Sequence, residues 1–458
     1  MKRYDAIVIG SGQGGNPLSH KLADHGWRVA LIEREHLGGT CVNTGCTPTK
    51  TMVASAQVAH YARNAERWGV RAGGVSVDLA TVVRRKDAIV ESFRSGQQRK
   101  VDSRPGLDLY RGHARFAGQR QIRVGEEILE ADRIFINTGT RTDVPRIQGI
   151  DKVPYLTNGT LMQLQDLPEH LIVLGGGYIG LEFGQMFRRF GSRVTIVHRG
   201  DQLLTREDAD VVEELRRTLE AEGIEFVLNA TTTAVRQSNG EITLDVDAAS
   251  LPTGAISGSH LLIATGRRPN TDDLGLDHAD VQTDERGFIR VNRRLETNVT
   301  GIWALGDVKG GPAFTHISYN DFQILYTNVI EGKDLGIDNR VVPYSVFTDP
   351  QLGRVGMTEA EARAKGYRLK IGRIPMSWVA RAIERDETAG MMKLVVDANT
   401  DRILGAAILA LEGGELVQML GVLMLADLPY TLLKGAVYIH PTLAEGFFTL
   451  MEEVKAAD

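Results

Sequence analysis

The sequence predicts an α/β fold in which two similar units of alternating strands and helices are followed by a separate α+β domain. Three observations support this prediction. A buried strand followed by a glycine-rich turn and a helix occurs twice, both turns fit the spacing G-x-G-x-x-G, and the chain after residue 338 alternates strands and helices without such a turn. At 458 residues the chain is also too long for a single hydrophobic core.

The composition is that of an ordinary globular protein, with 42% apolar and 24% charged residues. A net charge of -5 gives no reason to expect nucleic acid or a membrane surface as the main partner. No run of about 18 apolar residues occurs, so we expect no membrane span. The N-terminus lacks the pattern of a signal peptide, and we therefore expect a cytoplasmic protein.

The first unit reads as a strand over Ala6–Ile9, a glycine turn, a helix, and a second strand over Trp27–Ile32 that ends at Glu33. The glycines of the turn are Gly10, Gly12 and Gly15. They let a pyrophosphate approach the helix N-terminus, while Glu33, 23 residues on (33 minus 10), can accept from ribose hydroxyls. This is the pattern of a Rossmann-like dinucleotide site.

The second unit repeats the pattern with a strand over Leu171–Leu174, a helix over Leu181–Phe190 and a strand over Arg193–Val197. Its turn glycines are Gly175, Gly177 and Gly180. The repeat implies a second dinucleotide in the same chain.

The residue at the acid's position in this second unit is His198 (175 plus 23), with Arg199 next to it and Arg206 nearby. A missing carboxylate beside arginines suits a 2'-phosphate better than a free hydroxyl. We therefore expect NADPH, with NADH as the alternative; the other interpretation is that both arginines are surface charges.

The chain has only two cysteines, Cys41 and Cys46, and Lys50 follows four residues later. So few thiols in a cytoplasmic chain indicate a local redox disulfide or half of a metal site. We favour the redox disulfide. Helices are expected over Thr49–Trp68 and Leu79–Gln97.

Further on, the pattern of the strand over Arg133–Thr140 is repeated at Leu262–Asn270. Another strand-like stretch, Thr297–Asp307, ends in Gly-Asp. In the last domain we expect a final helix that carries Tyr438–Glu445, and four strands. These strands are Ser345–Phe347, Arg354–Met357, Met391–Asp397 and Ile403–Leu409.

Taken together, the two glycine units, the cysteine stretch and His440-Pro441-Thr442 with Glu445 resemble the group I pyridine nucleotide-disulfide oxidoreductases. This family includes dihydrolipoamide dehydrogenase, glutathione reductase and mercuric reductase. The resemblance covers essentially the whole chain. It implies two Rossmann-like dinucleotide-binding domains plus a C-terminal α+β dimerisation domain. The implied boundaries are 1–145 for the first part of the FAD-binding domain, 146–266 for the NAD(P)-binding domain, 267–338 for the second FAD-binding part and 339–458 for dimerisation.

The resemblance also implies roles for the thiols. Cys46 would lie against the flavin as the charge-transfer thiolate, and Cys41 would exchange with an external substrate. Lys50 would pair with Glu182 beside flavin N5; without the family, both would be read as solvated helix surface. His440, oriented by Glu445, would be the acid/base.

In this family the His-Glu dyad reaches the thiols of the partner subunit. The resemblance therefore implies a homodimer with two shared active sites.

Further cofactor contacts follow from the resemblance. Tyr178 would cover the flavin until nicotinamide displaces it, although a packed aromatic behind the turn is the equal alternative. Asp307 would hold the ribityl chain. The remaining contacts would be Gly39, Thr40 and Gly139 to FAD and Gly266 to the pyridine nucleotide.

The acceptor is left open between a small disulfide and a thiol-reactive metal ion. The cysteine stretch looks like that of mercuric reductase, yet we see no N-terminal metal-binding module and no C-terminal cysteine pair. Absence of that pair also disfavours high-molecular-weight thioredoxin reductase. His198 with Arg199 speaks against dihydrolipoamide dehydrogenase, which remains the alternative. We therefore expect a member of the mercuric-reductase-like branch, which includes copper-reducing flavoproteins. A flavin-based redox sensor or interaction protein is the alternative of another class.

Overall fold

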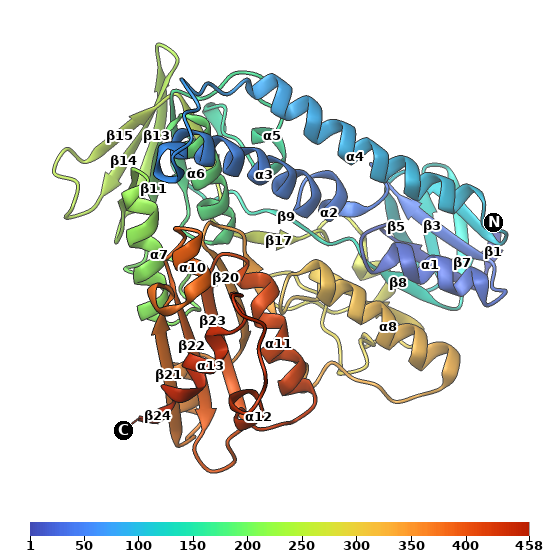
Figure 1. Cartoon of the computed structure of the whole chain (residues 1–458). Helices are drawn as coiled ribbons and strands as arrows, with labels where there is room; N and C mark the ends of the chain where they lie inside the picture. The colour runs from blue at the N-terminus through green and yellow to red at the C-terminus, as the bar shows by residue number, and fades with distance from the viewer. Residues whose placement is uncertain (458) are drawn as a thin grey trace.

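The computed structural model describes residues 1–457 and confirms the mixed α/β architecture (Figure 1). Two parallel sheets lie in the first three quarters of the chain, and an antiparallel sheet fills the last quarter. Figure 1 shows the last sheet and its helices packed below the second glycine unit, with the first unit extending to the opposite side. Within residues 1–457, no helix combines the length and the apolar character that crossing a membrane requires.

The first parallel sheet has the order β18-β8-β2-β3-β4. Its strands are β2 (Ala6–Ile9), β3 (Val29–Glu33), β4 (Leu107–Arg111), β8 (Ile134–Ile136) and β18 (Ile302–Ala304). The central strand β2 is buried throughout, as expected for a sheet covered on both faces. Helix α1 (Gly15–Asp24) joins β2 to β3 and packs against α8 (Thr315–Glu331). The turns after β2, β3 and β18 therefore meet at one edge of the sheet.

A second, smaller layer accompanies this sheet. It contains β1 (Lys2–Tyr4), β5 (Ala114–Gly118), β6 (Gln121–Val124) and β7 (Glu127–Ala131) in the order β1-β7-β6-β5, and a separate pair of β9 (Thr140–Thr142) with β17 (Arg267–Pro269). The β9·β17 pair brings the two parts of the chain that flank the second unit together.

The second glycine unit forms a parallel sheet in the order β12-β11-β10-β16. Its elements are β10 (His170–Leu174), α6 (Tyr178–Phe190), β11 (Arg193–Val197), α7 (Ala209–Ala221), β12 (Ile224–Val227) and β16 (His260–Ile263), preceded by α5 (Asn158–Leu161). A three-stranded sheet of β13 (Thr231–Ser238), β14 (Glu241–Asp247) and β15 (Ala255–Gly258) lies beside it. The predicted strand over Arg193–Val197 is confirmed.

The cysteine stretch folds into a short helix and the start of a long one, α2 (Gly39–Asn43) and α3 (Cys46–Arg63). Helix α3 packs against α4 (Leu79–Asp102) and against α6 of the second unit (Figure 1). Asp78 caps α4 by accepting from Thr81 N at 3.0 Å. Both helices differ from expectation at their ends: α3 stops at Arg63 and 3₁₀ turn η1 (Ala65–Trp68) follows, while α4 runs on past Gln97.

The C-terminal sheet has the order β19-β20-β23-β22-β21-β24. Its strands are β19 (Tyr344–Val346), β20 (Gln351–Gly356), β21 (Leu369–Pro375), β22 (Met391–Asp397), β23 (Ile403–Ala410) and β24 (Lys455–Ala457). Its helices are α9 (Glu359–Ala364), α10 (Ala380–Glu384), α11 (Gly413–Leu425), α12 (Thr431–Lys434) and α13 (Gly446–Glu452). Four further 3₁₀ turns complete the described elements: η2 (Ile150–Lys152), η3 (Leu276–Ala279), η4 (Gly306–Lys309) and η5 (Met376–Trp378).

The expectation that a helix carries Tyr438–Glu445 is wrong. These residues form an irregular segment, and the last helix, α13, begins only at Gly446. Pro441 explains the difference, because a proline disfavours helical backbone at the residue before it, here His440. His440 therefore lies on a loop ahead of the helix.

Candidate active site

The site is a cavity of about 1020 Å³ at the carboxyl edge of the first sheet, where it meets the second unit and the C-terminal domain. Twelve of the predicted site residues line it. They are Gly10, Gly12, Glu33, Gly39, Thr40, Cys41, Cys46, Lys50, Gly139, Tyr178, Glu182 and Asp307. Residues as far apart in the sequence as Gly10 and Asp307 thus share one cavity.

The floor of this cavity is the first glycine turn. Gly10 has a φ of +97°, and a Cβ there would lie 2.4 Å from the carbonyl oxygen of Asn137, so no other residue fits. Asn137 was not singled out from the sequence, but its side chain ties the turn to the neighbouring strands. It accepts from Gly15 N at 2.9 Å and donates to Leu305 O at 2.8 Å. An amide side chain at the end of the buried strand β8 is the signal that could have identified it.

Glu33 stands at the end of β3, as the dinucleotide pattern requires. Its carboxylate accepts from Ser11 N at 3.0 Å, from Ser11 Oγ at 2.6 Å and from Glu35 N at 2.9 Å. These bonds hold the carboxylate in the cavity wall. A carboxylate has about four acceptor positions, so one remains for a ribose hydroxyl.

Asp307 lies in the turn after β18 and accepts from Thr140 Oγ1 at 3.1 Å. The preceding residue, Gly306, donates its N–H to the fully buried Asp321 at 2.9 Å. Arg340 and Lys309 face the same carboxylate at 2.8 and 3.4 Å. Asp321, which the sequence analysis missed, thereby fixes the turn that presents Asp307.

The two cysteines are free thiols in the same cavity, Cys41 on α2 and Cys46 at the start of α3. The hydrogen bond from Cys41, the hydroxyl of Thr315 and the charge of Lys50 together lower the pKa of Cys46 to about 6, against the opposing effect of burial. Thr315 Oγ1 lies 3.2 Å from the Cys46 sulfur. The same hydrogen bond and burial raise the pKa of Cys41. Cys46 is therefore the thiolate of the pair near neutral pH.

The expected ion pair between Lys50 and Glu182 is present, with Nζ 2.6 Å from Oε2. Glu182 is only 5% exposed, and its other oxygen accepts from Phe347 N at 2.9 Å. Lys50 also lies over the Phe347 ring, 4.4 Å from its centroid. The pair joins α3 to α6 and the C-terminal domain, and it faces the thiols.

The glycines of the second turn, Gly175, Gly177 and Gly180, do not line this cavity. Gly175 has a φ of +120°, and a Cβ there would lie 2.3 Å from the carbonyl oxygen of Ala264. Nothing lies within 4 Å of the Cβ positions of Gly177 and Gly266, so both present open backbone. Gly180 packs against the turn itself.

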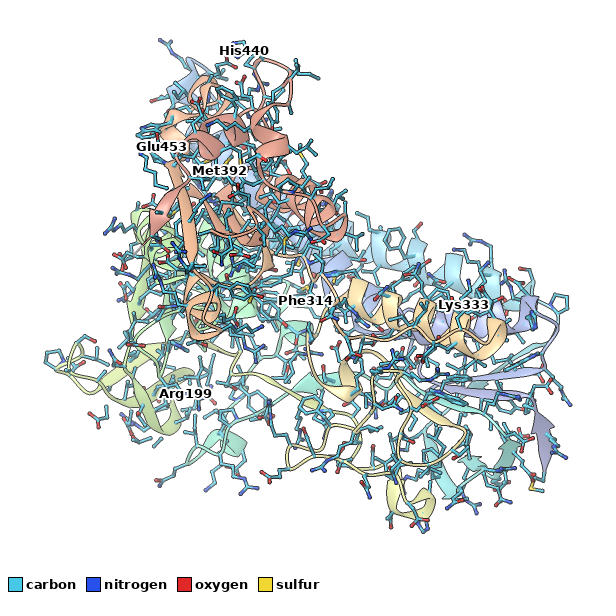
Figure 2. All side chains as sticks on the ribbon, turned by 90° about the horizontal axis from the view of Figure 1, so that it is seen from below. Arg199, Phe314, Lys333, Met392, His440 and Glu453 are labelled. Carbon is cyan, nitrogen blue, oxygen red and sulfur yellow. The ribbon has the colours of Figure 1, made fainter. Side chains whose placement is uncertain are left out.

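The His198 side chain, which stands where Glu33 stands in the first unit, does not point away from the glycine turn. Its Nδ1 accepts from Gly176 N at 3.1 Å, which turns the ring back onto the glycine turn, and burial lowers its pKa. Arg199 and Arg206 are both exposed, and Figure 2 shows Arg199 at the edge of the second unit. Neither guanidinium has an ion-pair partner among residues 1–457.

His440 and Glu445 form the expected dyad, with Nδ1 2.8 Å from Oε2. The imidazole is 72% exposed, and neither residue lines the cavity that holds the cysteines of the same chain. Figure 2 shows His440 at the far end of the C-terminal domain, well away from Phe314 beside the cavity. The structure thus brings together the thiols and Lys50–Glu182, but not the dyad.

Within residues 1–457, no cluster of three or more His, Cys, Asp or Glu side chains has the geometry to hold a metal ion.

Comparison with known proteins places this arrangement in context. Residues 4–321 match the pyridine nucleotide-disulphide oxidoreductase family, and residues 342–451 match the dimerisation domain of the same family. The probable pyridine nucleotide-disulfide oxidoreductase RclA of Escherichia coli is 38% identical, over 99% of this chain and 100% of its own. A mercuric reductase of Lysinibacillus sphaericus is 36% identical, over 97% of this chain and 81% of its own. A dihydrolipoyl dehydrogenase of Thermus scotoductus is 35% identical, over 100% of this chain and 98% of its own.

Among solved structures, the Cu(II) complex of the HOCl-induced flavoprotein disulfide reductase RclA from Escherichia coli superimposes with a TM-score of 0.91. It is 37% identical and covers 99% of this chain and 100% of its own.

Proposed function

Since this chain belongs to the pyridine nucleotide-disulphide oxidoreductases, a family of FAD-dependent flavoproteins, we propose that it transfers electrons from NADPH through FAD to the Cys41/Cys46 pair. From there they pass to a small disulfide or a thiol-reactive metal ion. The observation that carries the proposal is the environment of Cys46: a sulfur with a pKa of about 6 beside a second thiol, in the cavity that Gly10 and Glu33 line.

The residues present fit FAD. The glycine turn at Gly10 leaves room only for backbone, and Glu33 stands ready for ribose hydroxyls. Asp307 and the open backbone at Gly139 lie in the same cavity. We assign residues 1–145 and 267–338 to FAD binding on this basis. When bound, FAD accepts a hydride from the nicotinamide and supplies two electrons to a disulfide.

The thiol chemistry follows from the difference between the two cysteines. Reduction of a Cys41–Cys46 disulfide yields both thiols. Cys41, once deprotonated, attacks an external disulfide, forms a mixed disulfide and releases one thiolate, which takes up a proton. The Cys46 thiolate then attacks the Cys41 sulfur, releases the second thiolate, which also takes up a proton, and re-forms the internal disulfide. The hydrogen bond from Cys41, which is the largest cause of the lowered pKa of Cys46, is lost in the mixed disulfide, but the Thr315 hydroxyl and the charge of Lys50 still favour the Cys46 thiolate for this second attack.

Cys41 does need a base, because its pKa is raised, and His440 with Glu445 is the dyad suited to the task. The dyad is remote from the cysteines of its own chain, so we propose a homodimer in which each chain supplies it to the other. The match to a dimerisation domain supports this assembly. So do exposed apolar side chains around α11 and the His440 loop: Met419, Val422, Leu425, Leu428, Leu432, Val437 and Ile439.

For the electron donor we propose NADPH over NADH. His198 supplies no carboxylate for a ribose 2'-hydroxyl, and the exposed Arg199 and Arg206 are available to a 2'-phosphate. Tyr178, which lines the same cavity as Glu182, would cover the flavin until the nicotinamide enters.

The acceptor class rests on the relatives. One similar solved structure is the Cu(II) complex of a flavoprotein disulfide reductase, and several relatives are mercuric reductases. A metal ion that prefers thiolates would be taken by the cysteines themselves. Reduction of one Hg(II) to Hg(0), or of two Cu(II) to Cu(I), would consume the two electrons that the thiols hold and re-form the Cys41–Cys46 disulfide. Dihydrolipoamide dehydrogenase activity is the second candidate, favoured by the relatives of that name.

The test is anaerobic titration with NADPH and with NADH, followed by turnover with glutathione disulfide, lipoamide, Cu(II) and Hg(II). We expect NADPH oxidation with at least one acceptor, and loss of that turnover in Cys46→Ser. Reduction of the flavin without turnover on any acceptor would instead support a sensor.

A second experiment tests the shared site. Cys46→Ser and His440→Gln are each expected to be inactive as homodimers. Mixed dimers of the two should regain activity, because one of their two sites then combines an intact Cys46 with an intact His440. Mixed dimers as inactive as the parents would contradict the homodimer with shared sites.

A further inference from the structure

Four aromatic side chains from three separate parts of the chain form a column along the thiol cavity. Phe314 lies at its centre and stacks on Tyr344, with centroids 5.0 Å apart and ring planes at 14°. It stacks equally on His316, at 5.4 Å and 11°. Tyr178 meets the Phe314 ring at 6.4 Å in a tilted arrangement. Stacked rings at these distances attract one another, so Phe314, Tyr344 and His316 restrain each other.

One end of this column is fixed to the second glycine unit. The Tyr344 hydroxyl donates a hydrogen bond to Oε1 of Glu207, whose side chain is 4% exposed. Arg354, itself buried, lies 3.3 Å from the other oxygen of Glu207. Burial and the nearby Glu207 raise the pKa of Tyr344, so the phenol keeps the proton that it donates. Tyr344 thus holds its ring in one place by a buried, charge-assisted bond.

The centre of the column is connected to the thiols through the backbone. Phe314 is the residue immediately before α8, and Thr315 is the first residue of that helix. The Thr315 hydroxyl lies 3.2 Å from the Cys46 sulfur. Because adjacent residues share a rigid peptide unit, a shift of the Phe314 ring and backbone also moves this hydroxyl.

We propose that Tyr344 is a positioning residue of the thiol site: anchored on Glu207, it holds Phe314 in place and thereby keeps the Thr315 hydroxyl on the Cys46 sulfur. The inference deepens the function proposed above and rests on it for the use of Cys46 as a thiolate. Tyr344 itself touches neither thiol, so it acts through Phe314 and Thr315.

The test measures the titration of Cys46 directly. In flavin-bound protein carrying Cys41→Ser and ¹³Cβ-labelled cysteine, Cys46 is the only cysteine, and its carbon shift against pH gives its titration midpoint. Tyr344→Leu and Thr315→Val should each raise this midpoint by about half a unit to one unit, the worth of one hydrogen bond. Tyr344→Phe retains the ring and should raise it less than Tyr344→Leu.

The double variant decides whether Tyr344 acts through Thr315. If it does, Tyr344→Leu adds nothing once Thr315 is valine, because the bond that it positions is already gone. The other groups that influence the Cys46 titration are position 41, Lys50 and Glu182, and none of them differs among these variants.

The matched control is Tyr326→Leu. Tyr326 is a partly buried tyrosine on α8, the helix that begins with Thr315, and it packs in another hydrophobic cluster. It should leave the midpoint unchanged. An unchanged midpoint in Tyr344→Leu, an equal rise in Tyr326→Leu, or additive shifts in the double variant would each overturn the proposal. The titration is read without turnover, so failure of wild-type protein to oxidise NADPH refutes the proposed function while this experiment still decides the role of Tyr344.

Discussion

Removal of Lys50 should destabilise the protein more than removal of its partner Glu182. Glu182 is 5% exposed and Lys50 is 32% exposed. In Lys50→Met the buried carboxylate keeps only the bond from Phe347 N, whereas in Glu182→Gln the lysine still reaches solvent. Removing one partner of a buried pair costs about 3–5 kcal/mol. Because Lys50 is partly exposed, we expect about 2–4 kcal/mol for Lys50→Met, and about 1 kcal/mol for Glu182→Gln.

The double variant is the sharper test. Lys50→Met with Glu182→Gln no longer leaves a buried charge, so it should be more stable than Lys50→Met alone. The assay is denaturant unfolding of the flavin-bound protein, followed by tryptophan fluorescence. Lys2→Met, which breaks the exposed pair with Glu127, is the control and should have no measurable effect. A double variant less stable than both single variants would refute the reasoning.

Three further predictions concern the chemistry. In the reduced protein, the long-wavelength absorbance of a thiolate beside the flavin should disappear as the pH falls through about 6, because the pKa of Cys46 is lowered to that value. A midpoint near the ordinary thiol value of 9.0 would contradict this prediction. His440→Gln should slow disulfide reduction by about 10²–10⁴-fold in steady-state assays while leaving flavin reduction by NADPH, measured by stopped flow, at its wild-type rate. Arg199→Ala with Arg206→Ala should raise the KM for NADPH by about 10-fold or more and leave the KM for NADH unchanged; equal changes for both nucleotides would exclude a role in binding a 2'-phosphate.

Much of the site could be predicted because its signals are local. The glycine turn at Gly10, the acid at Glu33 and the cysteine pair lie within one stretch of chain and fit a known spacing. The parallel sheet then brings the ends of its strands to one edge, which is why Asp307 joins them.

What the sequence analysis missed depends on contacts between distant residues. Asn137 bonds to Gly15, 122 positions away, and the Tyr344 hydroxyl bonds to Glu207, 137 positions away. No period or spacing encodes such pairs, because hydrophobic periodicity reports only which face of an element is buried. A helix was wrongly expected at His440. Its absence has a local cause, because Pro441 disfavours helical backbone at His440 and this preference overrides the apolar pattern.

The proposed path carries electrons from NADPH to the Cys41/Cys46 disulfide. Reactive thiols in the oxidised protein can be counted before and after anaerobic addition of NADPH, with the protein denatured before labelling. We expect both cysteines to become labelled only after NADPH is added. If NADPH bleaches the flavin but neither cysteine becomes labelled, the disulfide is not on the electron path.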